Sequence, residues 1–168
     1  MKPGQTKMAT QRMTERHNAL FRKGYTWEQI LWAEAEYPRN PYRTGERMHV
    51  TSFGLDVRSK AECLIAEQLY DEILLFRSEE LLEMKGGRRF YPDFTILRPD
   101  GAVIYWEHAG MTYHKEYLQR HKQKMEEYEH AGIVPWENLI VSYDHVNGAY
   151  DAKKIHALIR SEEHTSEL

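Results

Sequence analysis

The sequence has one cysteine, Cys63, among 168 residues, and it has no run of about 18 apolar residues that would span a membrane. A single cysteine excludes an internal disulfide and suits a reducing compartment. The polar start, MKPGQTKMATQR, lacks the apolar core of a signal peptide. We therefore expect a cytoplasmic protein with no membrane partner.

Two common kinds of site are also missing. The nine histidines come without paired cysteines or an HExxH motif, so the sequence is a poor match to a zinc protein. His108, His114 and His121 have suggestive spacing, but a helix surface explains the last two better. Gly54 and Gly86-Gly87 match no nucleotide-binding fingerprint, which argues against a phosphate-binding glycine loop.

The composition fits one globular domain, with 41% hydrophobic and 29% charged residues. The net charge of -3 does not indicate nucleic-acid binding by itself. Lysine and arginine nevertheless cluster at 39–47, 85–89 and 115–124. Local basic patches can hold a phosphate backbone although the total charge is acidic.

Periodicity and turn residues predict an α/β fold with a mixed sheet flanked by helices and an N-terminal helical extension. The first two helices precede an irregular connection at 40–54. The predicted elements, in order, are helices 10–23, 26–36 and 60–71, a strand 73–76, two strands within 91–108, a helix 112–131, a strand 139–143 and a closing helix 151–159.

The two strands within 91–108 are the centre of this prediction. If Leu97 pairs with Val103 across the turn, Asp93 lies directly opposite Glu107 on the same face, with Cβ atoms roughly 4.5–5.5 Å apart. Two like charges placed there need a compensating cation or a raised pKa. Paired carboxylates suit Mg²⁺, which takes oxygen ligands. A one-residue slip in register would separate the acids, and the alternative is a solvated hairpin.

Two helices offer further side chains. Ser59 is a candidate N-cap for the helix at 60–71, which places Glu62 in the first turn. There the helix dipole favours a carboxylate, or Glu62 is a third acid of the metal site. On the helix at 112–131, one stripe combines aromatic and histidine side chains with a single lysine, Lys124. This lysine either has a buried partner or extends past its neighbours to water. The stripe is Tyr117, His121, Lys124 and Tyr128.

Three short blocks carry a resemblance: RSKAE at 58–62, YPDF at 91–94 and YWEH at 105–108. With these blocks in this order, the chain resembles the PD-(D/E)XK nuclease superfamily over about residues 49–159. The resemblance implies a restriction-endonuclease-like αβββαβ core at 49–159, preceded by a helical extension at 1–48.

The resemblance also implies Mg²⁺-dependent hydrolysis of nucleic-acid phosphodiester bonds, with DNA as the expected substrate and Mn²⁺ as a possible substitute ion. Asp93, Glu107 and Glu62 would hold the metal. The catalytic set would be Glu62, Asp93, Glu107 and Lys124, and the nucleic-acid-binding set Arg58, Lys60, Lys122 and Tyr128.

One position departs from the family pattern. The motif has a lysine two residues after the second acid, and here that position is Ala109. Lys124 on the following helix is our candidate replacement, with Lys60 and Lys122 as rivals. His108 is adjacent, but strand alternation points it to the opposite face from Glu107. The departure leaves an alternative: an inactive nucleic-acid-binding module that retains the nuclease fold.

The final residues, 160–168, read RSEEHTSEL. This string is similar to a translated sequencing adapter, which predicts a non-native tail. The alternative is an ordinary polar terminus. In both cases the segment is left out of fold prediction, as expression scars are.

Overall fold

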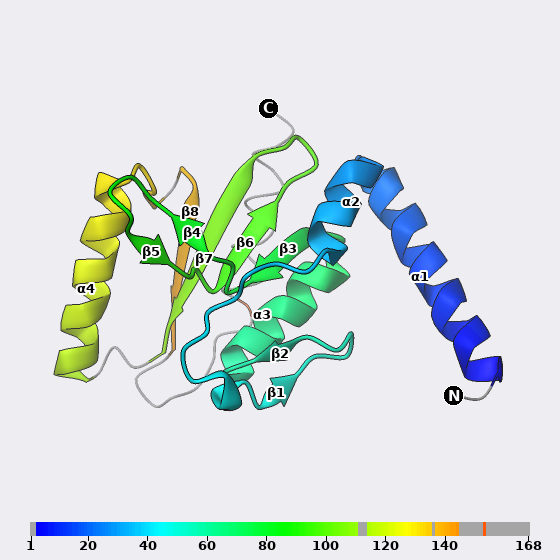
Figure 1. Cartoon of the computed structure of the whole chain (residues 1–168), viewed down its shortest axis with the longest axis horizontal. Coiled ribbons are helices and arrows are strands. Elements are labelled where there is room, and N and C mark those ends of the chain that lie inside the picture. The colour runs from blue at the N-terminus through cyan, green and yellow to red at the C-terminus, as the bar shows by residue number, and fades with distance from the viewer. Residues whose placement is uncertain (1–2, 111–113, 136, 145–152, 154–168) are drawn as a thin grey trace.

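A four-stranded mixed sheet forms the centre of the molecule (Figure 1). The computed structural model describes residues 3–110, 114–135, 137–144 and 153. The strands lie in the order β3-β6-β7-β8, antiparallel except for the parallel pair β7–β8. Their bounds are β3 Leu75–Ser78, β6 Phe94–Leu97, β7 Val103–Ala109 and β8 Leu139–Tyr143.

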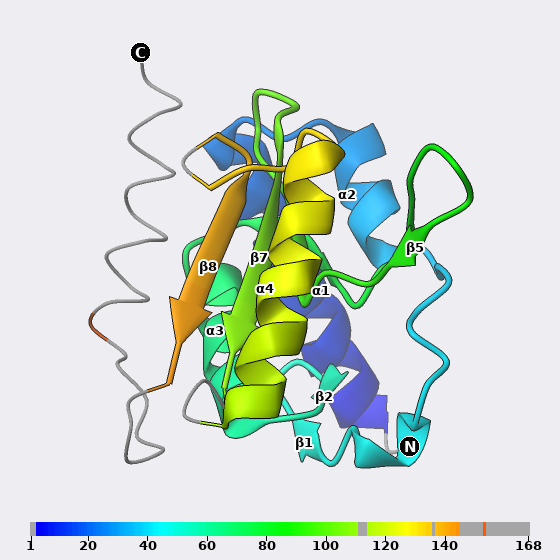
Figure 2. The same ribbon diagram turned by 90° about the vertical axis from the view of Figure 1, so that its left-hand side faces the viewer.

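Helices cover both faces of this sheet, as the sequence predicted. Helix α3 (Lys60–Asp71) packs on the face made by even-numbered residues of β6 and β7. Helix α4 (Lys115–His130) packs on the other face and lies along β7 in Figure 2. The α3 core comprises Ile65, Ala66, Leu69, Leu74, Phe94, Ile96, Ile104, Trp106 and Ile140, and the α4 core is built around Tyr128, Ile133 and Leu139.

The N-terminal extension consists of α1 (Pro3–Lys23) and α2 (Trp27–Glu34), which meet the sheet beside β3. The predicted capping box is confirmed: Thr26 Oγ1 accepts the Gln29 N–H, and Gln29 Oε1 accepts the Thr26 N–H. Helix α1 begins earlier than predicted, because residues 5–9 contain neither glycine nor proline and proline is tolerated in a first turn.

The segments predicted as irregular connections contain short regular elements. A two-stranded sheet, β1–β2, and a 3-10 turn, η1, lie before α3, and a second two-stranded sheet, β4–β5, lies between β3 and β6. Runs of two residues are too short for a sequence pattern to reveal. Their bounds are η1 Thr44–Glu46, β1 His49–Val50, β2 Asp56–Val57, β4 Leu82–Glu83 and β5 Arg89–Phe90.

The predicted strand at 73–76 was wrong by two residues. Ile73 has a positive φ of 59° and belongs to the turn that ends α3, so that β3 starts at Leu75. The turn follows because Leu74 N–H donates to Leu69 O and returns the chain toward the sheet. The predicted helix at 151–159, apart from Lys153, lies outside the described residues. So does the tail at 160–168.

None of the helices that the structure describes combines the length and apolar character needed to cross a membrane.

Tyr25 joins the helical extension to two strands. Its hydroxyl donates to Leu97 O at 2.6 Å and accepts the Leu75 N–H at 3.1 Å, and the residue is buried. One side chain therefore bridges β3 and β6 from the extension.

We predict that Tyr25→Phe lowers the free energy of unfolding by about 1–3 kcal/mol, because it leaves a buried N–H without its partner. Urea denaturation measures the change. Tyr42→Phe, at an exposed tyrosine, is the control and should stay within about 0.5 kcal/mol of wild type. An equally small effect of Tyr25→Phe would show that the bridge contributes nothing.

Candidate active site

The register between β6 and β7 is the one predicted from the sequence. Leu97 pairs with Val103 and Phe94 with Trp106, so Asp93, just before β6, lies opposite Glu107. The Asp93 Oδ2 atom accepts the His108 backbone N–H at 2.7 Å. Burial raises the pKa of Asp93 well above its usual range, and the nearby charges of Glu107 and Glu62 raise it further.

Glu107 is held by two side chains of α4. Glu107 is only 5% exposed. Lys124 Nζ donates to its Oε2 at 2.9 Å, and the Tyr128 hydroxyl donates to its Oε1 at 2.5 Å. Tyr128 is fully buried, and burial together with Glu107 raises the pKa of its hydroxyl. The buried partner predicted for Lys124 is therefore Glu107.

Lys124 carries its charge at this position. Burial by itself lowers the pKa of the amine, but Glu107 and Asp93 more than offset that effect, and the pKa lies above its ordinary value. The side chain is about one-third exposed. Lys124 thus supplies a positive charge to two acids and has access to solvent.

Glu62 joins the acids from the start of α3. The Ser59 hydroxyl accepts the Glu62 N–H at 3.1 Å, which confirms the predicted N-cap. Burial raises the pKa of the Glu62 carboxyl, and the charge of Glu79 adds to the effect. Because Glu62 in turn raises the pKa of Asp93, three acids from three elements act on one another here.

The other two residues of the predicted stripe, Tyr117 and His121, lie on the same face of α4 as Lys124 and Tyr128. Tyr117 O–H accepts the Gly110 N–H at 3.2 Å, and His121 Nε2 lies 3.3 Å from the Tyr143 hydroxyl. Burial raises the pKa of Tyr117 and lowers that of His121, with smaller effects from Glu107 and Lys124 on both. Lys124 and Tyr128 thus contact Glu107 directly, and Tyr117 and His121 contact Gly110 and Tyr143.

His108 points to the opposite face from Glu107, as strand alternation predicted. Its Nδ1 lies 2.7 Å from Ser142 Oγ, and its Nε2 lies 2.8 Å from Asp144 Oδ1. Trp106 Nε1–H also donates to Ser142 Oγ at 2.9 Å. The ring of His108 belongs to this second buried group and does not face the acids.

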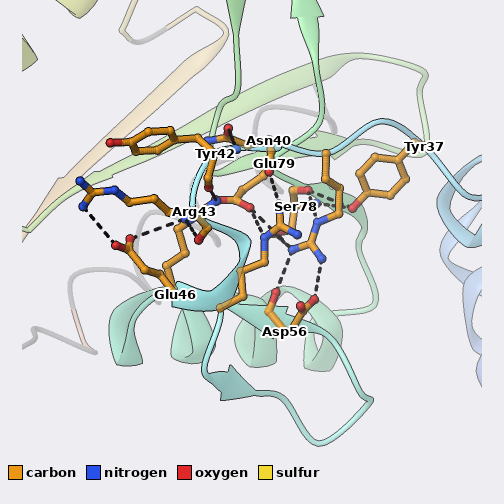
Figure 3. Close-up of polar contacts among 11 residues, drawn as sticks. Tyr37, Asn40, Tyr42, Arg43, Glu46, Asp56, Ser78 and Glu79 are labelled. Atoms are coloured by element: carbon orange, nitrogen blue, oxygen red, sulfur yellow. Dashed lines mark hydrogen bonds and ion pairs between the residues drawn. The ribbon is translucent and has the colours of Figure 1, made fainter.

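Glu79 belongs to no sequence motif and was not predicted as a site residue. It is 4% exposed, has a φ of +52°, and accepts hydrogen bonds from Arg47 Nε at 2.7 Å and from Arg58 Nε. Its backbone N–H donates to Asp93 O at 3.1 Å. Figure 3 shows Glu79 at the centre of these polar contacts. A buried ion-pair group, which we call the Glu79 cluster, thus supports the backbone of Asp93. The cluster comprises Arg39, Arg47, Arg58, Asp56, Ser78 and Glu79.

The predicted nucleic-acid-binding residues occupy different positions. Arg58 is committed to the Glu79 cluster, and Tyr128 holds Glu107. Lys60 is exposed at the start of α3, where it adjoins the Ser59 cap. Lys122 is exposed on α4 but lies about 200° around the helix from Lys124. Of these four, only the two lysines have free access to a ligand.

The donor atoms fit a hard cation. Carboxylate oxygens are the ligands that Mg²⁺ takes, and the ion often uses one or two of them together with water and phosphate. No group of three or more histidine, cysteine or acidic side chains converges to hold a metal within the described ranges. Asp93 and Glu107 supply two carboxylates, of which one Asp93 oxygen and both Glu107 oxygens accept hydrogen bonds from the protein.

No protein-family model matches the chain, and neither does any curated protein. Support for a function comes from the chemistry and geometry of this site.

We predict that Asp93→Asn stabilises the protein in EDTA at pH 8. Because the folded state favours the protonated carboxyl, Asp93 lowers stability as pH rises through its raised pKa, and it has no such cost below the ordinary value of 3.8. The gain should therefore shrink toward pH 3. Urea unfolding across this pH range measures it.

Asp100 provides a control of opposite sign. A hydrogen bond from Ala102 N–H lowers the pKa of its exposed carboxyl, with help from Arg98. Asp100→Asn should therefore lose stability at pH 8 and none at pH 3. If Asp93→Asn loses stability at pH 8, as Asp100→Asn does, the burial of the Asp93 charge is not what sets the pH dependence.

Proposed function

We propose that the chain is a metal-dependent nuclease of the PD-(D/E)XK superfamily, with a restriction-endonuclease-like core, which hydrolyses phosphodiester bonds of nucleic acid. The contact that carries the proposal is Lys124 Nζ to Glu107 Oε2 at 2.9 Å. It brings a lysine from α4 to the acid whose motif lysine is replaced by Ala109. DNA is the expected substrate.

The element order supports the same proposal. The core runs α3, β3, β6, β7, α4 and β8, which is the αβββαβ order that the family resemblance implies. The two small sheets and the helical extension are additions to this core. Asp93 immediately precedes β6, and Glu107 lies within β7 next to the last residue that pairs with β6.

Asp93 and Glu107 would hold Mg²⁺, with Glu62 helping through a water. A bound Mg²⁺ polarises the phosphate and lowers the pKa of an attacking water. Lys124 remains an ammonium at neutral pH because Glu107 and Asp93 raise its pKa. It therefore orients the water or stabilises charge on the phosphate, and it does not act as the base.

The supporting residues fix the acids. Tyr128 and Lys124 each hold one oxygen of Glu107, and the His108 N–H holds one oxygen of Asp93. These three contacts hold both carboxylates in defined orientations in the folded chain.

The second candidate function is an inactive nucleic-acid-binding module with the same fold. The observation in its favour is that both oxygens of Glu107 already have protein partners. This module would bind nucleic acid in a salt-sensitive way and would not cleave it with Mg²⁺.

We predict that Asp93→Ala and Lys124→Ala each reduce the rate of Mg²⁺-dependent DNA cleavage by about 10²-fold or more, since each removes a group that acts on the reacting phosphate. Plasmid and linear DNA are incubated with Mg²⁺, Mn²⁺ or EDTA. Arg22→Ala, at an exposed residue of α1, is the control.

Cleavage by Asp93→Ala at the wild-type rate contradicts the assigned roles. Normal cleavage by Lys124→Ala, together with a loss in Lys122→Ala or Lys60→Ala, moves the basic role to the other lysine. Salt-sensitive binding without any cleavage by the wild type favours the inactive module.

We also predict that Mg²⁺ stabilises the wild type by about 2.7 kcal/mol at a concentration 100 times its Kd. The effect should grow with pH, because the ion must displace the proton that the raised pKa keeps on Asp93. Thermal unfolding measures it. Asp93→Asn should lose the response and Asp100→Asn should keep it. An equal response in both would place the ion elsewhere.

A further inference from the structure

The arginines that precede β1 fall into two groups. Arg39 and Arg47 are largely buried in the Glu79 cluster, where they bind Asp56 and Glu79. Arg43 is different, because its side chain is 62% exposed. Its neighbour Tyr42 is 63% exposed. An aromatic ring and a cation are thus presented side by side to solvent.

The backbone beneath these two residues is fixed. Arg58 Nη2 donates to Tyr42 O at 2.6 Å, and Arg58 Nη1 donates to Arg43 O at 2.9 Å. Arg58 is itself anchored on Glu79, and Asn40 Oδ1 accepts the Tyr42 N–H at 3.0 Å. Arg43 has a φ of +44°, a conformation that non-glycine residues adopt at a cost in free energy. One arginine therefore holds a strained turn in place.

The side chains point away from the cluster that holds them. In Figure 3, Tyr42 and Arg43 extend in the same direction, away from Tyr37 and Asp56. The Arg43 guanidinium lies over the Tyr42 ring, with its carbon 5.1 Å from the ring centroid. In Figure 2 the segment before η1 runs along the outer edge of the molecule, below β5. Tyr42 and Arg43 are therefore exposed to solvent on this edge.

The same cluster connects this turn to the acids. Glu79 N–H donates to Asp93 O, and Arg58 immediately precedes the Ser59 cap of the helix that carries Glu62. The charge of Arg58 also lowers the pKa of the Glu62 carboxyl, against the larger effect of burial. The turn and the acids are thus fixed to one rigid support, which sets the position of Tyr42 and Arg43 relative to Asp93.

We propose that Tyr42 and Arg43 form a contact for single-stranded nucleic acid next to the acidic site; the proposal rests on the nuclease function proposed above. Tyr42 stacks on an unpaired base and Arg43 binds the phosphate beside it. Aromatic rings with neighbouring cations are the common means of holding single strands. Arg58 is a positioning residue that presents the pair.

The ion pair within the turn does not block this role. Arg43 Nη1 lies 3.3 Å from Glu46 Oε1, and both side chains are more than half exposed. Exposed pairs of this kind contribute little, so a phosphate can take the place of Glu46. Stacking by Tyr42 requires a base that is free of its own stack, which a duplex does not offer. The contact therefore selects single strands.

Fluorescence anisotropy in EDTA tests the contact without cleavage. The probes are a labelled single-stranded oligonucleotide and the duplex of the same sequence. Tyr42→Ala should weaken single-strand binding by about tenfold, as expected for the loss of one stacked base. It should change duplex binding by less than about twofold, since the paired base is not available. Tyr42→Phe retains the ring and should bind the single strand as tightly as the wild type does.

Arg43→Ala should weaken binding to both probes and reduce the slope of log affinity against log salt by about 1. Arg22→Ala, on α1, is the matched control and should leave both affinities unchanged. Thermal unfolding verifies that the variants are folded. Equal effects of Tyr42→Ala on single strand and duplex, or single-strand binding like that of wild type, would overturn the proposal.

The outcomes also separate this proposal from the nuclease function. If the wild type cleaves with Mg²⁺ and Tyr42→Ala binds normally, the contact is wrong and the nuclease stands. If single-strand binding depends on Tyr42 but no cleavage occurs with Mg²⁺ or Mn²⁺, the contact stands on an inactive module. A wild type that binds neither probe overturns the contact.

Discussion

Asp93 and Glu107 lie opposite each other at the end of the β6–β7 pair, where burial and the second carboxylate make the charged form of Asp93 costly. The surrounding structure balances this cost in two ways. Lys124 and Tyr128 come from α4 to hold Glu107, and the His108 backbone holds Asp93. The positions of both acids therefore depend on α4 and on β7. The two acids meet only when β6 and β7 pair in the observed register.

Much of this arrangement was predictable because it follows from local rules. Strand pairing around a short turn fixes which residues oppose each other, so one assumed pair, Leu97 with Val103, was enough to place Asp93 opposite Glu107. Helical spacing placed Tyr117, His121, Lys124 and Tyr128 on one face, and the Ser59 cap placed Glu62 in a first turn. Each of these predictions needed only residues close in sequence.

What the sequence could not predict depends on contacts between distant segments. Glu79 reads as one acid in a polar connection, and only the folded chain brings Arg47 and Arg58 to it. The positive φ of Ile73 shifted β3 by two residues, because a bulky residue in that conformation has no sequence signature. The same tertiary contacts separated the arginines of 39–47, which look alike in the sequence, into buried and exposed groups.

His108 makes contacts on both faces of the sheet. Its main-chain amide binds Asp93, while its imidazole is fixed behind the strand between Ser142 and Asp144. Any disturbance of the imidazole is thereby transmitted to the amide through a single α-carbon. The contacts of the imidazole with Ser142 and Asp144 thus help to fix the amide that binds Asp93, and a substitution behind the strand would displace an acid on the front of it.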